Sequence, residues 1–162
     1  MEKEEQEEGN RLDDSADCKY NHRGGDWAKG IWSGGTHDLG SCSVTYENGD
    51  HYEGEWAYGQ REGAGTMEYA NGDHYEGEWS LDQKTGTGSM VYANGESYEG
   101  EWSYDDRTGR GTYTFSDGTR ITANWNQNRV IMDDTGVITK PDGTEYKAVW
   151  MDGKLQMEAY GS

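Results

Sequence analysis

The sequence predicts an all-β protein, an elongated single-layer antiparallel meander of about six β-hairpins. Two observations carry this prediction. Trp56, Trp79, Trp102 and Trp125 follow one another at a constant interval of 23 residues, which is the mark of a repeat architecture. In the central copies, an Asn-Gly dipeptide precedes a segment whose residues alternate in character with period two, as expected of a strand that follows a tight turn.

The expected elements follow in order along the chain. Residues 1–23 carry no copy of the repeat and are expected to form a disordered acidic tail. The copies lie near residues 25–45, 46–68, 69–91, 92–114, 115–139 and 140–155, so that the array covers residues 24–155 and residues 156–162 form a C-terminal tail. The second, third and fourth copies are nearly identical, whereas the outer copies diverge, as terminal repeats generally do.

Each copy is expected to fold as a hairpin around a turn dipeptide. The dipeptides are Asn48-Gly49, Asn71-Gly72, Asn94-Gly95, Asp117-Gly118 and Asp142-Gly143. Asn-Gly and Asp-Gly favour a two-residue type I′ turn, in which both central residues have positive φ. Loops such as Ala57–Glu62 are expected to join one hairpin to the next.

The composition fits a thin, aromatic fold. Only 31% of the 162 residues are hydrophobic and the formal net charge is -18, values that are typical of disorder. The seven Trp and twelve Tyr contradict that interpretation, because disordered acidic segments are poor in aromatic residues. The 25 glycines are expected to serve the turns and to leave room for neighbouring rings.

The charge and the cysteines exclude several classes of protein. A chain of charge -18 repels nucleic acid phosphates, so no nucleic acid partner is expected. No apolar run approaches the roughly 20 residues that span a bilayer, and the acidic N-terminus does not resemble a secretory signal. Cys18 and Cys42 cannot form a disulfide framework, so two free thiols and a cytoplasmic location are expected.

Alternation along the strands separates two candidate binding faces. Tyr52, Gly54 and Trp56 point to one face, and the glutamates between them point to the other. An exposed row of aromatic side chains often marks an interaction site, although the same rings also form the core of such a sheet. The candidate residues on the aromatic face are Tyr52, Trp56, Tyr75, Trp79, Tyr98, Trp102 and Trp125, and those on the acidic face are Glu53, Glu55, Glu76, Glu78, Glu99 and Glu101. The acidic residues are expected to form two columns, which either simply face solvent or favour a basic partner.

Neither a metal site nor a catalytic site is expected. His51, Glu53 and Glu55 share a face, but neighbours on one face of a strand lie about 6.7 Å apart, too far apart to bind one zinc ion without a cross-strand ligand. The glutamates recur in every central copy, so that none of them is singled out as a catalytic pair. The sequence therefore predicts a protein that is not an enzyme and has no cofactor.

The repeated text resembles the MORN repeat (membrane occupation and recognition nexus). The matching text is YEGEW at 52–56, 75–79 and 98–102, together with GAGT at 63–66, GTGS at 86–89 and GRGT at 109–112. ITANW at 121–125 and YKAVW at 146–150 depart from the pattern. The resemblance implies an elongated single-sheet scaffold of the cytoskeleton, of cilia or of membrane-proximal assemblies, which holds a partner peptide or helix or forms a dimer.

The expected function is that of a non-catalytic protein-interaction scaffold. The aromatic face would hold a basic or helical protein segment, and the glutamate face would help to select it. Two alternatives stay open: a peripheral membrane module that binds phosphoinositide, which the charge disfavours, and a carbohydrate-binding repeat protein. A homodimer is compatible with each of them.

Overall fold

The structure, a computed structural model, describes residues 17–22, 26–30, 39–46, 48–57, 60–131, 133 and 135–159. Within these residues it describes the side chains from residue 40 onward, except those of residues 42 and 150. No helix in the described part of the chain is long and apolar enough to span a bilayer.

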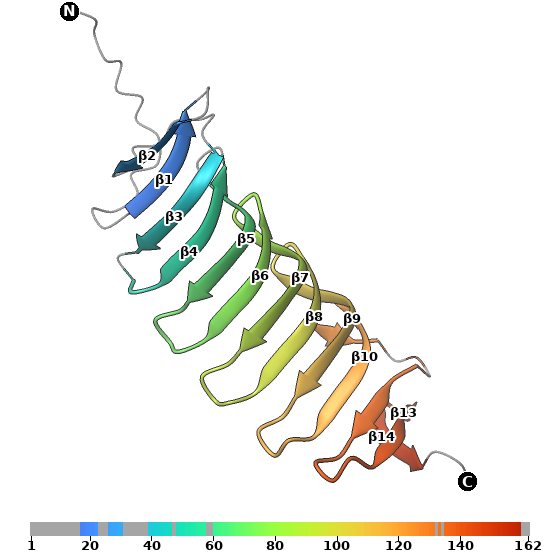
Figure 1. Cartoon of the computed structure of the whole chain (residues 1–162). Coiled ribbons are helices and arrows are strands. Elements are labelled where there is room, and N and C mark those ends of the chain that lie inside the picture. The colour runs from blue at the N-terminus through green and yellow to red at the C-terminus, as the bar shows by residue number, and fades with distance from the viewer. Residues whose placement is uncertain are drawn as a thin grey trace, which may run out of the picture.

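The described residues form one open antiparallel sheet of 14 strands in a single layer (Figure 1). The strands are β1 (Asp17–His22), β2 (Asp26–Gly30), β3 (Leu39–Thr45), β4 (His51–Ala57), β5 (Gln60–Glu68), β6 (His74–Ser80), β7 (Gln83–Val91), β8 (Ser97–Ser103), β9 (Asp106–Thr114), β10 (Arg120–Asn126), β11 (Arg129–Val130), β12 (Val137–Thr139), β13 (Glu145–Met151) and β14 (Lys154–Ala159). From β3 to β14 they follow chain order, with the short β11 beside β10 off the main path. The predicted all-β meander of hairpins is confirmed.

The N-terminal end of the sheet departs from the simple meander. Asp17–His22 lie in the segment expected to be a disordered tail, but they form β1, which pairs with both β2 and β3. β2 therefore lies at the edge of the sheet and runs in the same direction as β3, one strand away. Residues 1–16 lie outside the described residues.

The turns at the Asn-Gly dipeptides differ from the predicted type I′. At residues 69–72 the amide of Gly72 donates to the carbonyl of Tyr69 at 2.9 Å, and Gly72 has a φ of +95° whereas neither Ala70 nor Asn71 has positive φ. This is a type I turn followed by a left-handed glycine, the usual three-residue hairpin loop. The carbonyl oxygen of the Asn71 side chain accepts the amide of Asp73 at 2.9 Å, a local bond that stabilises the turn.

The two-residue type I′ turns lie at the opposite ends of the hairpins. Leu81 and Asp82 both have positive φ, +49° and +66°, and join β6 to β7 directly. The pairs Tyr104-Asp105, Gln127-Asn128 and Asp152-Gly153 have the same conformation. The predicted loops between units are thus tight turns wherever the structure describes them.

A β-bulge bends each central hairpin. The register between β6 and β7 shifts between Gly77 and Glu78, and β4–β5 and β8–β9 shift at the equivalent places. Gly86, on the bulged strand, has a φ of +54°, a conformation that favours glycine. The second strand of each of these hairpins is longer than the first, and the bulge accommodates its extra residues. As a result, the first residues of this longer strand lie opposite the tryptophan of its partner strand.

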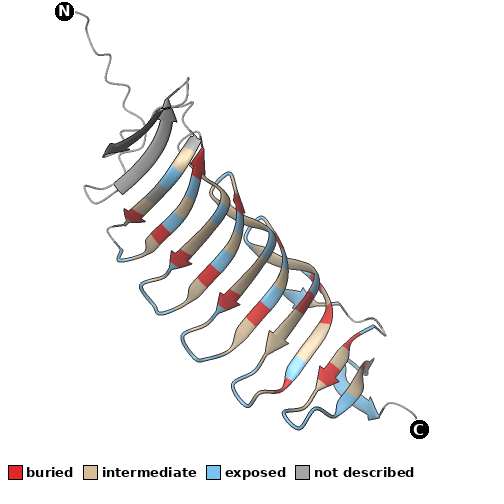
Figure 2. Ribbon diagram, viewed as in Figure 1, coloured by how far each residue is buried: buried red, intermediate tan, exposed pale blue. Residues whose placement is uncertain are grey.

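The core is a row of aromatic side chains along one face of the sheet. Tyr52, Tyr75 and Tyr98 are fully buried, and buried residues recur at the same positions of successive hairpins (Figure 2). Tyr75 packs edge-on against Trp79 of its own repeat and Trp102 of the next, with ring centroids 5.2 Å and 5.4 Å apart. Each repeat therefore contributes half of a core that only its neighbour completes.

Candidate functional site

The aromatic face is covered by the chain itself. Trp79 and Trp102 are 2% and 4% exposed, and a basic side chain lies over the ring of each. The guanidinium of Arg61 is 4.5 Å from the Trp79 ring, and the ammonium of Lys84 is 5.2 Å from the Trp102 ring. Arg107 takes the same place over Trp125 at 4.7 Å. The tryptophan rings of this face therefore lie buried beneath cations of the chain itself.

Hydrogen bonds to the next turn hold these cations in place. Nε of Arg61 donates to the carboxylate of Asp82 at 3.1 Å, and its Nη2 donates to the backbone carbonyl of the same residue at 2.8 Å. Arg107 bonds in the same way to Asn128, one repeat further along. These bonds clamp each repeat onto the next and hold the cation over the rings.

The ionisable groups of this face lie in a largely dry environment. Burial raises the pKa of Tyr98 to about 12 and that of Tyr69 to about 12, because the phenolate would lose hydration. Burial also lowers the pKa of the Lys84 ammonium, although Asp105 acts in the opposite direction. The face therefore behaves as the interior of the array.

The opposite face carries a long groove. It has a volume of about 1050 Å³ and extends from β4 to β10, over a floor formed largely by the glycines of the bulged hairpins. The residues that line it are Glu53, Ala64, Gly65, Thr66, Glu76, Gly77, Glu78, Thr87, Gly88, Ser89, Glu99, Gly100, Arg110, Gly111, Thr112 and Thr122.

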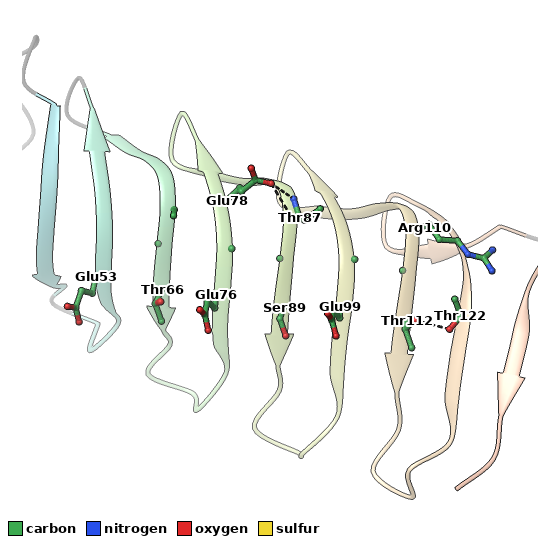
Figure 3. Close-up of a pocket in the computed structure, with 16 residues that line it drawn as sticks. Glu53, Thr66, Glu76, Glu78, Thr87, Ser89, Glu99, Arg110, Thr112 and Thr122 are labelled. Carbon is green, nitrogen blue, oxygen red and sulfur yellow. Dashed lines mark hydrogen bonds between the residues drawn. The ribbon is translucent and has the colours of Figure 1, made fainter. Parts of the chain in front are cut away.

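One row of polar side chains runs along this groove, and we call it the groove row. Figure 3 shows its members side by side on successive strands. Cross-strand register places them in the order Glu53, Thr66, Glu76, Ser89, Glu99, Thr112 and Thr122. Carboxylates alternate with hydroxyls from Glu53 to Thr112, so that successive carboxylates are two strands, or about 9.6 Å, apart.

The two predicted carboxylate columns have different roles. Glu78 accepts the amide of Thr87 at 2.5 Å, and Glu55 accepts the amide of Ala64 at 2.6 Å, so both close the bulge of their own hairpin. A Cβ on Gly86 would overlap the Glu78 carboxylate, which explains the glycine at this place. In contrast, Glu53, Glu76 and Glu99 have no hydrogen-bond or ion-pair partner among the residues that the structure describes. Glu101 of the first column has no such partner either, so the second column is the one in which all three carboxylates lack a partner among the described residues.

The family model of the MORN repeat matches residues 52–74, 75–97 and 98–120. Residues 52–120 of the chain are three MORN repeats. MORN repeats are generally non-catalytic binding modules, and these three contain most of the groove row and the central part of the aromatic core. No curated protein matches the chain in a comparison of whole sequences.

Sequence reasoning missed the hydroxyl members of the groove row of the MORN repeats. Thr66, Ser89 and Thr112 end the GAGT, GTGS and GRGT texts, which in the sequence serve only to recognise the repeat. Each of them precedes an Asn-Gly or Asp-Gly turn and lies opposite a glutamate of the strand before it, and this position could have indicated that they share the glutamates' face. Arg110 also lines the groove, where its guanidinium donates to the carbonyl of Thr135 at 3.2 Å.

Two other sequence predictions concern metals and thiols. Among the side chains that the structure describes, no group of three or more His, Cys, Asp or Glu is arranged to hold a metal ion. The backbone register places Cys18 opposite Cys42 on β1 and β3, but the side chains of both lie outside the described residues.

Proposed function

We propose that the MORN array holds a basic protein segment in the groove of its acidic face. The observation that carries the proposal is the groove row, in which three carboxylates without a described partner line one continuous hollow. Carboxylates placed along a groove attract Lys and Arg side chains and fix their register. The partner-binding role expected for the aromatic rings is not retained in this proposal, because the chain's own cations cover them.

The shape of the groove favours an extended segment. From β4 to β10 it covers six strand spacings, or about 29 Å. An α-helix rises about 1.5 Å per residue and would need about 19 residues to cover this length. A chain in the polyproline II conformation rises about 3.1 Å per residue and needs only about nine residues for the same length.

The spacing of the carboxylates selects the same kind of ligand. Polyproline II has three residues per turn, so every third side chain points the same way at intervals of about 9.3 Å. The carboxylates of Glu53, Glu76 and Glu99 recur at about 9.6 Å. A segment with a basic residue at every third position would therefore meet one glutamate per turn. A phosphoinositide headgroup, by contrast, would meet three carboxylates of its own sign.

The test is fluorescence anisotropy with a labelled nine-residue peptide made of three Arg-Pro-Pro triplets. We expect saturable binding that weakens as salt is added. The double variant Glu76→Gln and Glu99→Gln should bind at least tenfold more weakly. Its matched control is Glu145→Gln and Asp152→Asn, which removes the same charge outside the groove and should bind like the wild type. An equal loss of peptide affinity in the two double variants would contradict the proposal. Binding of the protein to phosphoinositide vesicles and not to the peptide would also contradict it.

A further inference from the structure

A small pocket opens on the core side of the sheet in the C-terminal part of the described array. Its volume is about 70 Å³, and the residues that line it include Ile121, Ala123, Val130, Gly136, Ala148 and Leu155. Among the described residues of this lining, Asp133 alone is charged. One water molecule needs about 10–15 Å³ of such space, so the pocket has room for roughly as many atoms as one aromatic ring contains.

The cations that cover the aromatic rings of the described array end before this pocket. Register places Arg107 opposite Trp102, and Val130 takes the same position opposite Trp125. On β14 this position belongs to Leu155, which is 37% exposed. Apolar side chains therefore stand where the central repeats carry Arg or Lys, and they leave an apolar opening.

The pocket lies where the central repeats place a tyrosine ring. The ring of Tyr98 lies on Gly111, because a Cβ built there would come within 2.5 Å of two ring carbons. In the next repeat Ile121 replaces this tyrosine, and the register of β10 with β12 gives Gly136 the place of Gly111. The nearest described atom to a Cβ built on Gly136 is the methyl carbon of Ala148. The ring site is thus kept in the backbone, but it is lined by methyl groups and not filled by a tyrosine.

The same comparison indicates a ring without a hydroxyl group. A Cβ on Gly100 would lie 2.7 Å from the hydroxyl oxygen of Tyr98, and the next repeat carries Ala123 at the place of this glycine. The hydroxyl of Tyr98 donates to the carbonyl three residues further on. The corresponding carbonyl, that of Asn124, already accepts the amide of Ile131 at 2.8 Å. A buried hydroxyl without an acceptor is unfavourable, so the pocket suits a phenyl group better than a phenol.

We propose that this pocket binds the phenylalanine side chain of a partner protein. A pocket that one aromatic side chain can fill, with exposed apolar residues at its mouth, has the features of a binding hot spot. It lies beyond the rings that Arg61, Lys84 and Arg107 cover, and on the opposite side of the sheet from the groove. The proposal therefore does not depend on what the groove binds.

The test is an NMR titration of the full chain, labelled with ¹³C in the methyl groups of Ile, Val and Leu. The ligands are three capped tripeptides, Gly-Phe-Gly, Gly-Tyr-Gly and Gly-Ala-Gly. The phenylalanine tripeptide should shift the methyl signals of Ile121, Val130 and Leu155 in a saturable manner. The tyrosine tripeptide should bind at least fivefold more weakly, and the alanine tripeptide should leave these signals unchanged.

Two variants should close the pocket. Leu155→Lys restores the residue type that Lys84 provides in the central array, and it should weaken binding of the phenylalanine tripeptide at least fivefold. Ile121→Phe fills the pocket with a ring of the chain itself and should abolish binding. The matched control is Val91→Lys, which replaces an exposed apolar side chain outside the pocket and should bind like the wild type.

Three results would overturn the proposal. The first is that the phenylalanine tripeptide leaves the three methyl signals unchanged. The second is equal affinity for the phenylalanine and tyrosine tripeptides, because the site would then not exclude a hydroxyl group. The third is unchanged affinity in Ile121→Phe, or equal weakening in both lysine variants, because binding would then lie elsewhere. Circular dichroism of each variant checks folding.

Discussion

At the scale of single residues, glycine decides where the aromatic rings can lie. A Cβ built on Gly88 would approach two ring carbons of Tyr75 to 2.6 Å, much closer than any real contact. Gly65 and Gly111 have the same relation to Tyr52 and Tyr98. The tyrosine ring therefore packs directly on the backbone of a glycine in the next strand along the chain, where a side chain would leave no room. The hydroxyl of each of these tyrosines donates to a backbone carbonyl.

Replacing such a glycine should disrupt the core. Gly88→Ala is expected to lower the free energy of unfolding by about 1–3 kcal/mol, because the new methyl group overpacks the Tyr75 ring. Urea unfolding followed by tryptophan fluorescence measures the change. The control is Ser89→Ala, the next residue of β7, which faces the groove and should change stability little. Equal stability of the two variants would contradict this packing.

The two glutamates of β6 should respond differently to the same substitution. Glu78→Ala leaves the amide of Thr87 without its acceptor and should cost about 1 kcal/mol. Glu76→Ala removes an exposed side chain without a described partner and should leave stability within about 0.5 kcal/mol of the wild type. Thermal unfolding of both variants separates the structural carboxylate from the one left for a ligand. If Glu76→Ala were the more damaging change, the two columns would have been assigned wrongly.

At the scale of elements, the two ends of each hairpin use different turns. The Asn-Gly ends place glycine where φ must be positive, whereas the opposite ends place ordinary residues there. Leu81 and Tyr104 have φ of +49° and +50°, and they are 67% and 78% exposed. A left-handed conformation is unfavourable for such residues, and little packing offsets it.

These turns should therefore be easy to stabilise. The double variant Leu81→Asn and Tyr104→Asn is expected to raise the free energy of unfolding by about 1 kcal/mol, because Asn adopts the left-handed region readily in a type I′ turn. Differential scanning calorimetry measures the shift in Tm. Val91→Asn removes an exposed apolar side chain from the extended strand β7 and should not raise the Tm. A lower Tm for the double variant would show that the two side chains make contacts that matter.

Sequence alone predicted the hairpins and their two faces because both depend on short-range pattern. The alternation of Tyr52 with Glu53 follows directly from the pleat of a strand. The turn type was not predictable, because Asn-Gly suits both a type I′ turn and a type I turn with a following left-handed glycine. The covering of the rings was not predictable either. It depends on the bulge that brings Arg61 opposite Trp56 and on a bond from Arg61 to a turn 21 residues away.

At the scale of the whole molecule, the array is one continuous core shared between repeats. Indole nitrogens of Trp79, Trp102 and Trp125 each donate to a glycine carbonyl of the preceding repeat at 3.1 Å. Rings, cations and these bonds all cross the boundary between repeats. No repeat of the central array is complete by itself, so we expect the array to unfold as a unit.

The buried tyrosines predict how this unit responds to alkali. The pKa of Tyr69 and that of Tyr98 are raised to about 12 in the folded state, so above pH 10 the unfolded chain loses protons that the folded chain retains. Their contribution to stability is complete below pH 10 and is lost as the pH rises through about 12. These tyrosines should leave the Tm nearly constant from pH 8 to 10, and the Tm should fall steeply above pH 10. Tyrosinate absorbance should rise together with unfolding; ionisation of these tyrosines near pH 10 in a folded protein would contradict their burial.

The central claim is that a ligand binds in the groove and not on the aromatic face. Its most direct test is an NMR titration of the uniformly ¹⁵N-labelled full chain with the Arg-Pro-Pro peptide. The account predicts that the largest amide shifts follow the groove row, at Thr66, Glu76, Ser89 and Glu99, while the turn residues Leu81 and Tyr104 change little. Shifts concentrated on the indole N–H signals and on the Arg61 and Arg107 side chains, with the groove row unchanged, would contradict it.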